Sequence, residues 1–387
     1  MNAPQNGFEQ KPLHSSARLI SYAVASPLCS IAQDEAAQLV QHLGLTQRWN
    51  KAVPALYRKS GVQRRGSVLL EKEDGEPHAR QSFYPIRSDE KPYGPTTSER
   101  MLAYGLHSGP LLLRACREAL DKSNLPAEQI THLVTVSCTG FQAPGVDQVL
   151  FANLGLPATT QRTHVGFMGC HGMINGLRVA ASFVESNPDA VVLVGAVELC
   201  TLHQQYSEDP EQIVANSLFA DGAAAAILTG RSQKQHTWEI QSSFSVQISN
   251  SHDLMTWKVG DHGFAMTLSS QVPLRIAEDL KKPLCHWLSQ HGISIEQIDH
   301  WVVHPGGPRI LDGVIDSLQL HSDALAASRH ILANHGNMSS PTVMFIFDEV
   351  LKRNASVSES QRCLMLGFGP GLHAEALLLV KPQQAPQ

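Results

Sequence analysis

One cysteine in this chain has neighbours that could make its thiol a nucleophile. Cys170 is followed by His171, and the pair lies between Gly169 and Gly172. Apolar side chains then recur at helical spacing: Met173, Leu177, Ala180, Ala181 and Val184. This spacing predicts a buried helix that begins just after the cysteine. The free N–H groups and positive dipole end of such a helix favour a thiolate, so we expect a lowered pKa at Cys170.

Two further polar residues lie at predicted element boundaries. His304 ends the apolar segment 300–304 and precedes a proline, which favours an extended backbone before it. Asn337 lies in a loop, with Ser340 and Pro341 predicted as the N-cap and first residue of the next helix. A histidine and an amide near a cysteine can assist acyl transfer as proton acceptor and oxyanion donors. Taken singly, each has a simpler alternative: a buried apolar thiol, a structural histidine and a turn asparagine.

Strand and helix patterns alternate along the chain and predict a layered α/β fold with a largely parallel core. Apolar or alternating segments predict strands at residues 17–25, 132–137, 190–197, 238–249 and 300–304. Helical spacing predicts helices within 33–60, at 97–123, with its cap near Ser98, and at 272–290. The three candidate residues therefore fall where strands or loops meet helices, and α/β sheets place their ligands at such junctions.

Length and composition limit the possible functions. The 387 residues are long for one core, so we divide the chain into a disordered tail (1–16), a first half with the cysteine (17–230) and a second half with the histidine and asparagine (231–387). A net charge of −5 argues against a nucleic-acid partner. No apolar run reaches the ~18 residues of a membrane span and the N-terminus has no secretion signal, so we expect a cytoplasmic protein without a membrane partner.

Cysteine spacing predicts no metal centre. The seven cysteines are scattered, odd in number and without a C-x-x-C pair. This pattern indicates reduced thiols, and it fits neither a disulfide framework nor a zinc site.

Two other segments have a composition suited to ligand contact. The basic segment R-K-S-G-V-Q-R-R contains Arg58, Lys59, Arg64 and Arg65. It is either a solvated face or a phosphate-binding rim, since arginine and lysine bind phosphates. Near the C-terminus, a Gly-rich turn between two strands is predicted at Gly367, Phe368, Gly369, Pro370 and Gly371. No helix follows it, so it is not a dinucleotide fingerprint, and its glycines would let the backbone approach a ligand.

Four strings together resemble a known family. The strings G-F-M-G-C-H-G, W-V-V-H-P-G-G-P-R-I-L-D, G-N-M-S-S-P and G-F-G-P-G-L are similar to the hallmark segments of the chalcone synthase-like, type III polyketide synthases. The resemblance extends from about Ala17 to Val380. It implies a thiolase-like fold of two related α-β-α-β-α halves, working as a homodimer. It also implies an acyltransferase that condenses malonyl-CoA onto an acyl-CoA starter and cyclises the product to a pyrone, resorcinol or phloroglucinol.

The resemblance assigns roles to individual residues. Cys170 matches the acyl-carrying nucleophile, and His304 and Asn337 match the pair that hydrogen-bonds thioester carbonyls. Phe219 matches the gate of the coenzyme A tunnel, and Lys59 matches a lysine that contacts coenzyme A phosphates. The turn 367–371 is expected to line the cyclisation pocket. The family needs no metal or other cofactor, because coenzyme A thioesters are substrates.

Several matched positions differ from the plant enzymes. Two basic positions of the plant enzymes fall on Ala52 and Ala55, so Arg58 or the Arg64–Arg65 pair is expected to substitute. The pocket positions that differ are Met266 for a second gate phenylalanine, Trp257 for a glycine, and Cys138, Cys200 and His203 for threonines, with Ala143 for a dimer-loop methionine. The stretch M-T-W-K-V-G-D-H-G-F-A-M-T-L-S resembles bacterial members that make alkylpyrones, alkylresorcinols or small phenols. Bulky Trp257 narrows the pocket, whereas flexible Met266 can open it.

Three other classes share part of this pattern. A ketoacyl-carrier-protein synthase of the initiating kind also uses cysteine, histidine and asparagine, and a test of acyl-CoA against carrier-protein thioesters distinguishes it. A cysteine hydrolase is disfavoured, because the C-G-S-C-W signature is absent. A non-catalytic acyl-CoA-binding homologue would release no coenzyme A from malonyl-CoA.

Overall fold

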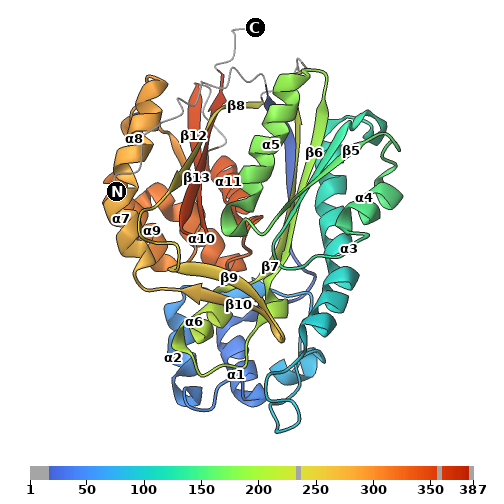
Figure 1. Ribbon diagram of the computed structural model, residues 1–387, viewed down its shortest axis with the longest axis vertical. Coiled ribbons are helices and arrows are strands. Elements are labelled where there is room, and N and C mark those ends of the chain that lie inside the picture. Colours follow the sequence, from blue (N-terminus) through green and yellow to red (C-terminus); the bar gives the residue numbers. More distant parts are fainter. Residues whose placement is uncertain (1–16, 232–236, 355–359, 383–387) are drawn as a thin grey trace, which may run out of the picture.

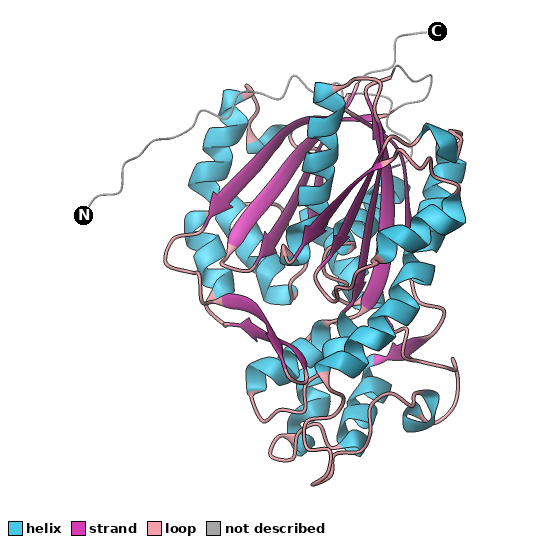
Figure 2. Cartoon of the chain, turned by 45° about the vertical axis from the view of Figure 1, so that its right-hand side comes forward, coloured by secondary structure: helices cyan, strands magenta, loops and turns pink. Residues whose placement is uncertain are grey.

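Nine strands form one sheet in the computed structural model, which describes residues 17–231, 237–354 and 360–382. The strands are β1 Arg18–Ala25, β4 His132–Ser137, β5 Gln161–Gly166, β6 Val191–Leu199, β7 Asp221–Thr229, β8 Trp238–Gln247, β11 His300–Val303, β12 Gln361–Gly369 and β13 His373–Lys381. Their spatial order is β11-β12-β13-β8-β1-β7-β6-β4-β5, with helices on both faces (Figure 2). The five strands expected from apolar or alternating segments and the two expected around the Gly-rich turn are therefore present.

The sheet repeats one pattern of strands twice. On one side, β4 is parallel to β6, and the pairs β6–β7 and β7–β1 are antiparallel. On the other side, β11 is parallel to β12, and the pairs β12–β13 and β13–β8 are antiparallel. The two runs join where β1 pairs with β8. This repeat confirms the expected duplication, but the sheet is mixed and not largely parallel. Continuous apolar runs report burial on both faces and carry no information on strand direction.

Two central helices connect the halves through the core. Helix α5 (Gly172–Ser186) packs on β4 and β6 of one half and on β13 of the other. Helix α11 (Thr342–Arg353) packs on β11 and on β1 and β7. Side chains from both helices, such as Leu177 and Phe347, belong to one buried apolar cluster. Because this cluster lies between the two halves of the sheet, burial of α5 depends on both halves.

The remaining helices cover the outer faces and the lower end of the molecule (Figure 1). Helix α3 (Thr97–Ser123) packs on β1, β7 and β6. The others are α1 Gln33–Leu43, α2 Val53–Lys59, α4 Val146–Leu154, α6 Pro210–Leu218, α7 Val272–Asp279, α8 Lys281–Gln290, α9 Pro308–Leu318 and α10 Ala326–His335. No helix in the described ranges is both long and apolar enough to cross a membrane.

Two helix predictions need correction at the level of single residues. Helix α3 has the expected bounds, but its N-cap is Thr96, which forms a capping box with Glu99, and not Ser98. The single helix expected over 272–290 is two helices, α7 and α8, that meet at Leu280. Pro283 lies in the first turn of α8, where its missing N–H is tolerated.

Two short hairpins lie outside the main sheet. Strands β2 (Ser30–Ala32) and β3 (Arg64–Gly66) form one of them. Strands β9 (Met255–Gly260) and β10 (Gly263–Leu268) form the other, in which Trp257 lies opposite Met266. In Figure 1 the β9–β10 hairpin crosses below the main sheet and above α6. It therefore forms a wall that is separate from the nine-stranded sheet.

The turn after β12 packs closely against the turn that carries Cys170. A Cβ built on Gly169, at φ 75°, would overlap the ring of Pro370, and a Cβ built on Gly369 would overlap the ring of His171. The glycines at these positions therefore allow two turns from opposite halves to interlock. The hairpin expected at residues 367–371 is present, and Phe368 is buried within it. In this structure Gly367 and Gly369 face His171, in the turn that carries Cys170.

This interlock predicts different costs for two similar substitutions. Gly155 has φ 72° and open space around its Cβ position, so Gly155→Ala should lower the free energy of unfolding by only about 1–2 kcal/mol, through backbone strain. Gly169→Ala has the same strain plus the overlap with Pro370 and should cost about 1–3 kcal/mol more. Urea unfolding of both variants measures the difference. Equal losses would mean that the two turns are not tightly packed.

Candidate active site

Cys170 lies between β5 and α5, in a 3-10 turn formed by Gly169–His171. Helix α5 begins at Gly172, and its apolar positions are buried as the spacing predicted. The thiol is 6% exposed, at the junction of the turn and the helix. The sequence prediction of a helix that begins just after the cysteine is therefore confirmed.

The expected pKa of Cys170 was wrong in direction. Burial raises the pKa of this thiol to about 11, and the charge of Glu198 acts in the same direction. The hydroxyl of Ser339 and the amide of Asn337 lower the pKa of Cys170 but do not outweigh burial. The helix start was readable from local spacing, whereas burial depends on segments far away in the sequence. The resting thiol is thus protonated at neutral pH.

Asn337 is held by its backbone and by one side of its amide. Its N–H donates to Leu218 O at 2.9 Å, and its carbonyl accepts the N–H of Ala220 at 2.9 Å. Its side-chain Oδ1 accepts the N–H of Ser339 at 2.8 Å. In the described part of the chain the Nδ2 atom is buried without a hydrogen-bond partner, although the amide lies near enough to the Cys170 thiol to lower the pKa of that thiol. The amide is therefore oriented with its donor side free.

His304 follows β11 and is anchored to the neighbouring strand. Its backbone N–H donates to Leu366 O at 2.8 Å, and its side chain is 1% exposed. Neither ring nitrogen has a partner among the described residues. Burial, together with the nearby ring of His171, lowers the pKa of His304 to about 3. The ring is therefore neutral above that pH, so it can accept one proton and donate another.

Sequence analysis missed a buried carboxylate beside Cys170. Glu198 is fully buried on β6 and accepts the N–H of Cys138 at 3.0 Å, the hydroxyl of Thr139 at 2.7 Å and the hydroxyl of Ser340 at 2.6 Å. The thiol of Cys138 also donates to it, at 3.2 Å. Burial raises the pKa of Glu198. A lone carboxylate in a continuous apolar strand signals such a network, since buried charges need partners.

The hydrogen bonds of Glu198 also explain why the predicted N-cap of α11 (Thr342–Arg353) was wrong. Ser340 was expected to cap this helix with Pro341 at its first position. Instead, Pro341 is the N-cap and Ser340 turns its hydroxyl to Glu198. The Ser340 hydroxyl bonds the distant carboxylate and not the start of α11, because a buried carboxylate binds a hydroxyl more strongly than a helix end does.

The predicted pocket residues surround two small cavities. The first, of about 20 Å³, is lined by Cys170 and Ser339 among others, and the second, of similar volume, adjoins it. Residues of the predicted pocket that line one or both are Phe219, Met266, Trp257, Cys138, Cys200 and His203. Pro370 is the residue of the Gly-rich turn that lines the first cavity. Each cavity has space for about one water molecule.

Trp257 and His203 attach the β9–β10 hairpin to this site. The indole N–H of Trp257 donates to Cys138 O at 2.7 Å. His203 bonds Thr139 O through Nε2 at 2.7 Å, and its Nδ1 accepts the N–H of Phe264 at 3.0 Å. Burial lowers the pKa of His203 to about 3, so this ring is neutral and fully bonded. His203 therefore holds the wall in place and has no free nitrogen for chemistry.

One residue of the basic segment does not fit the expected phosphate site. Arg65 is 2% exposed and donates to the carbonyls of Asn216 and Phe219, so its place in the predicted coenzyme A site needs correction. A charge pattern along the sequence does not show whether a side chain is buried. The guanidinium of Arg65 is enclosed and already bonded to backbone carbonyls, so it is not available to a phosphate.

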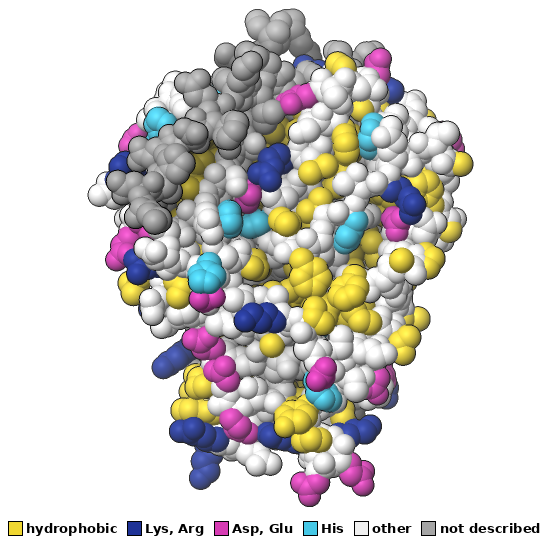
Figure 3. Space-filling model, viewed as in Figure 1, with side chains coloured by type: hydrophobic (Ala, Val, Ile, Leu, Met, Phe, Trp, Pro, Cys, Tyr) yellow, Lys and Arg dark blue, Asp and Glu magenta, His cyan; other side chains and the backbone are white. Residues whose placement is uncertain are grey.

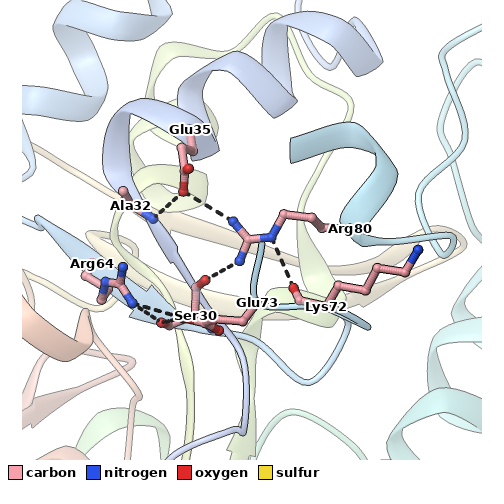
Figure 4. Close-up of polar contacts among 7 residues, drawn as sticks. All are labelled: Ser30, Ala32, Glu35, Arg64, Lys72, Glu73 and Arg80. Atoms are coloured by element: carbon pink, nitrogen blue, oxygen red, sulfur yellow. Dashed lines mark hydrogen bonds and ion pairs between the residues drawn. The ribbon is translucent and has the colours of Figure 1, made fainter. Parts of the chain in front are cut away.

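The neighbouring basic residues have different surroundings. Arg64 is exposed but bonded to Glu73 at 3.0 Å and to Ser30 at 2.7 Å (Figure 4). Arg58 lies 3.9 Å from Asp34, with both side chains exposed. Lys59 is exposed, and no ion pair or side-chain hydrogen bond to it is found in the described part of the chain.

Comparison with known proteins places this geometry in a family. The family model for the N-terminal domain of chalcone and stilbene synthases matches residues 99–231, and the model for their C-terminal domain matches residues 239–381. The alpha-pyrone synthesis polyketide synthase-like Pks18 of Mycobacterium tuberculosis is 31% identical over 92% of this chain and 89% of its own. A putative chalcone synthase of Bacillus subtilis is 30% identical, over 93% and 97%.

Solved structures agree with the sequence relatives. The crystal structure of PKS-I from the brown alga Ectocarpus siliculosus matches with a TM-score of 0.86 and 29% identity, and covers 94% of this chain and 98% of that one. The type III polyketide synthase domain of Steely1 from Dictyostelium matches with a TM-score of 0.83 and 25% identity, over 94% and 99%. The chain therefore belongs to the chalcone and stilbene synthase family and is a bacterial-type type III polyketide synthase with a thiolase-like fold.

Proposed function

We propose that Cys170 carries the starter and the growing chain as a thioester, while His304 and Asn337 bind the oxyanions that form. One observation supports this assignment most strongly: the amide Nδ2 of Asn337 and both ring nitrogens of His304 are buried without a partner among the described residues. The Asn337 amide lies near the Cys170 thiol, and the ring of His304 lies near that of His171, the residue after Cys170. Buried polar atoms nearly always have a hydrogen-bond partner, so free groups at these positions suit a substrate carbonyl.

Loading begins from a neutral pair, because the Cys170 thiol is protonated and His304 is uncharged near pH 7. The thiol proton passes to His304 as the sulfur attacks the carbonyl of an acyl-CoA. The oxyanion of the tetrahedral intermediate accepts a hydrogen bond from Asn337. Coenzyme A leaves as a thiolate and takes the proton from His304, so the neutral histidine is regenerated.

Extension then uses malonyl-CoA. Its carboxylate leaves as CO₂, and the electron pair of that C–C bond forms an enolate. The enolate oxygen accepts hydrogen bonds from Asn337 and from the N–H of neutral His304. The enolate carbon attacks the thioester carbonyl, and the Cys170 thiolate leaves. Return of the lengthened chain to Cys170 releases coenzyme A and permits another cycle. These steps use coenzyme A thioesters as substrates and draw on no other cofactor.

The small cavities favour a compact starter. Trp257 and Met266 lie between the two spaces of about 20 Å³, so a long alkyl chain needs both side chains to move. We propose a short acyl-CoA or malonyl-CoA as starter and a small pyrone, resorcinol or phloroglucinol as product. Incubation of the purified enzyme with malonyl-CoA and a panel of acyl-CoA starters, followed by mass spectrometry, tests this proposal. Products from long-chain starters alone would contradict it.

We also propose that the active enzyme is a cytoplasmic homodimer. Seven free cysteines suit a reducing compartment. Large apolar side chains are exposed on α3 (Leu102 at 73%, Leu106 at 69%) and beside the terminal strand β5 (Phe141 at 54%, Phe167 and Met168). Figure 3 shows hydrophobic side chains gathered between α5 and α3 on the face in view. A second copy that covers this patch would remove its apolar surface from water.

Alkylation tests the state of the Cys170 thiol. Cys29 and Cys285 are half-buried and should react with iodoacetamide, so labelling is expected at more sites than Cys170. Among the buried thiols Cys170 should react first, because burial and Glu198 raise the pKa values of Cys138 and Cys200 further. The Cys170 rate should rise about tenfold per pH unit from pH 7 to 10, as the thiolate fraction grows below a pKa of about 11. Peptide mapping measures each site. A rate plateau near pH 7 would mean that the start of α5 outweighs burial.

Truncation of Trp257 tests its role as a wall. Trp257→Gly should join the two cavities and shift the starter preference toward longer acyl chains. Trp257→Phe, the matched control, keeps most of the bulk and removes the hydrogen bond to Cys138 O, so its starter profile should stay close to wild type. Competition between acyl-CoA starters, read by mass spectrometry, compares the three proteins. An unchanged profile for Trp257→Gly would exclude this residue from the acyl site.

Separate assays of CO₂ release and product formation distinguish the three catalytic roles. Cys170→Ala should abolish product but keep measurable decarboxylation of malonyl-CoA, since the enolate needs no thiolate. Asn337→Ala should slow both activities by roughly 10²–10³, the usual loss for one oxyanion donor. His304→Ala should lose more product formation, because it also removes the proton acceptor of the loading step. If Asn337→Ala released labelled CO₂ at the wild-type rate, its oxyanion role would be wrong.

A further inference from the structure

His171 is a buried histidine to which the proposed mechanism gives no role. It follows Cys170 in the turn before α5 and is 4% exposed. Its Nδ1 lies 2.6 Å from Oδ1 of Asn175, an oxygen that only accepts hydrogen bonds, so Nδ1 carries the ring hydrogen. Nε2 is therefore the bare nitrogen, and it is buried without a partner within the described ranges. A nitrogen in this state can bind a proton.

The ring of His171 lies between the end of β12 and the residues of the candidate site. A Cβ built on Gly369 would overlap Nε2, so a glycine there leaves room for this nitrogen. The residues of β12 that contact His171, Gly367 and Gly369, have no side chain to titrate. The ring also lies near enough to His304 to lower the pKa of that histidine. Two buried imidazoles, each with a free nitrogen among the described residues, are therefore neighbours beside the thiol.

Ionisable groups of α5 and β13 also lie near His171. Arg178 of α5 pairs with Glu375 of β13 at 2.6 Å, and His373 at the start of β13 is half-buried, so it contacts solvent. Burial lowers the pKa of His171, whereas the hydrogen bond to Asn175 and the charge of Glu375 raise it. His373 and Arg178 lower the pKa of His171 further. The ring is therefore neutral at rest near pH 7, and a proton bound to it is readily given up.

The proposed reaction needs a proton that Cys170 supplies only once. In loading, the thiol proton passes to His304 and then to the departing coenzyme A, so no proton is taken from water. In each extension one C–C bond breaks to release CO₂, and the new C–C bond to the thioester carbonyl frees the Cys170 thiolate. That thiolate attacks the lengthened ester, and coenzyme A leaves as a thiolate with no Cys170 proton to take. One proton must therefore enter the site in every extension.

We propose that His171 binds this proton and passes it to His304, which gives it to the departing coenzyme A. The proton comes from water beside the half-buried His373. In this scheme His171 touches no substrate and acts through His304, so it is a positioning residue for the proton. The proposal rests on the proposed function and gives a role to the histidine that follows the nucleophile.

Separate rates for loading and extension test this role. His171→Phe keeps a ring but has no nitrogen to bind a proton. Its loading rate, read as acyl-enzyme formation from a starter alone, should equal that of wild type, because loading takes no proton from water. Its extension rate should fall roughly tenfold at pH 7, and the loss should grow as pH rises, since fewer solvent protons reach His304. His300→Phe is the matched control: His300 is buried with an Nε2 that has no partner in the described chain, but it lies at the other end of β11, so both rates should be unchanged.

Rescue by a small acid separates proton transfer from a structural effect. At constant pH and ionic strength, added imidazole should speed extension by His171→Phe, because it supplies the missing proton, and should not change the wild-type rate. His171→Gln, whose amide is polar but binds no proton, should show the same difference between loading and extension.

Two results would overturn the inference while the proposed function stands. One is a wild-type extension rate in His171→Phe. The other is an equal loss of loading and extension in both variants without a response to pH or imidazole, since His171 would then only support the fold. A wild-type protein that forms no acyl-enzyme would instead refute the proposed function, on which the inference rests.

Discussion

Burial of the Glu198 carboxylate is the constraint on which the candidate site depends. Its hydrogen-bond donors come from the segment after β4 (Cys138 and Thr139) and from Ser340, just before α11 in the other half of the chain. A buried charge without such donors would be costly, so each donor is held to its place. Burial raises the pKa values of Cys170, Cys138 and Cys200, and the charge of the same carboxylate adds to this effect. One group thus joins the halves and helps to keep the thiols around the cavity protonated.

The site lies where the duplicated halves touch. The first half supplies Cys170 from the turn before α5, and the second supplies His304 and Asn337 from the ends of β11 and α10. The glycines at 169 and 369 allow the two turns to pack without side chains between them. Neither half alone contains both the thiol and its hydrogen-bond donors. The chemistry therefore depends on the packing between halves as much as on any single residue.

Local signals in the sequence were sufficient for elements but not for their long-range partners. The bounds of β4 and α3, the helix after Cys170 and the hairpin around residues 367–371 follow from periodicity and turn residues. The four family strings supplied the candidate triad. The contact between Glu198 and Ser340 cannot be predicted from periodicity, because the two residues are 142 positions apart in the sequence.

The incorrect expectations share one physical cause, which is burial by distant segments. The position of Arg65 in a basic run suggested a surface cation, yet its side chain is enclosed and bonded to carbonyls. The pKa of Cys170 followed burial and not the helix start beside it. Strand direction was equally invisible, since an apolar run looks the same in parallel and antiparallel pairs. The β9–β10 hairpin was missed although the G-D-H-G segment between its strands is a recognisable turn signal.

The hairpin has a consequence for how such an enzyme can diversify. Trp257 and Met266 belong to a two-stranded ribbon that shares no strand pairing with the nine-stranded sheet. Its attachment beside the cavity includes single hydrogen bonds, from Trp257 to Cys138 O and from Phe264 to His203. Substitutions in the ribbon can therefore reshape the cavity while the sheet around Cys170 and Asn337 stays intact. Lineages that share one mechanism can in this way acquire new products through a few changes in this ribbon.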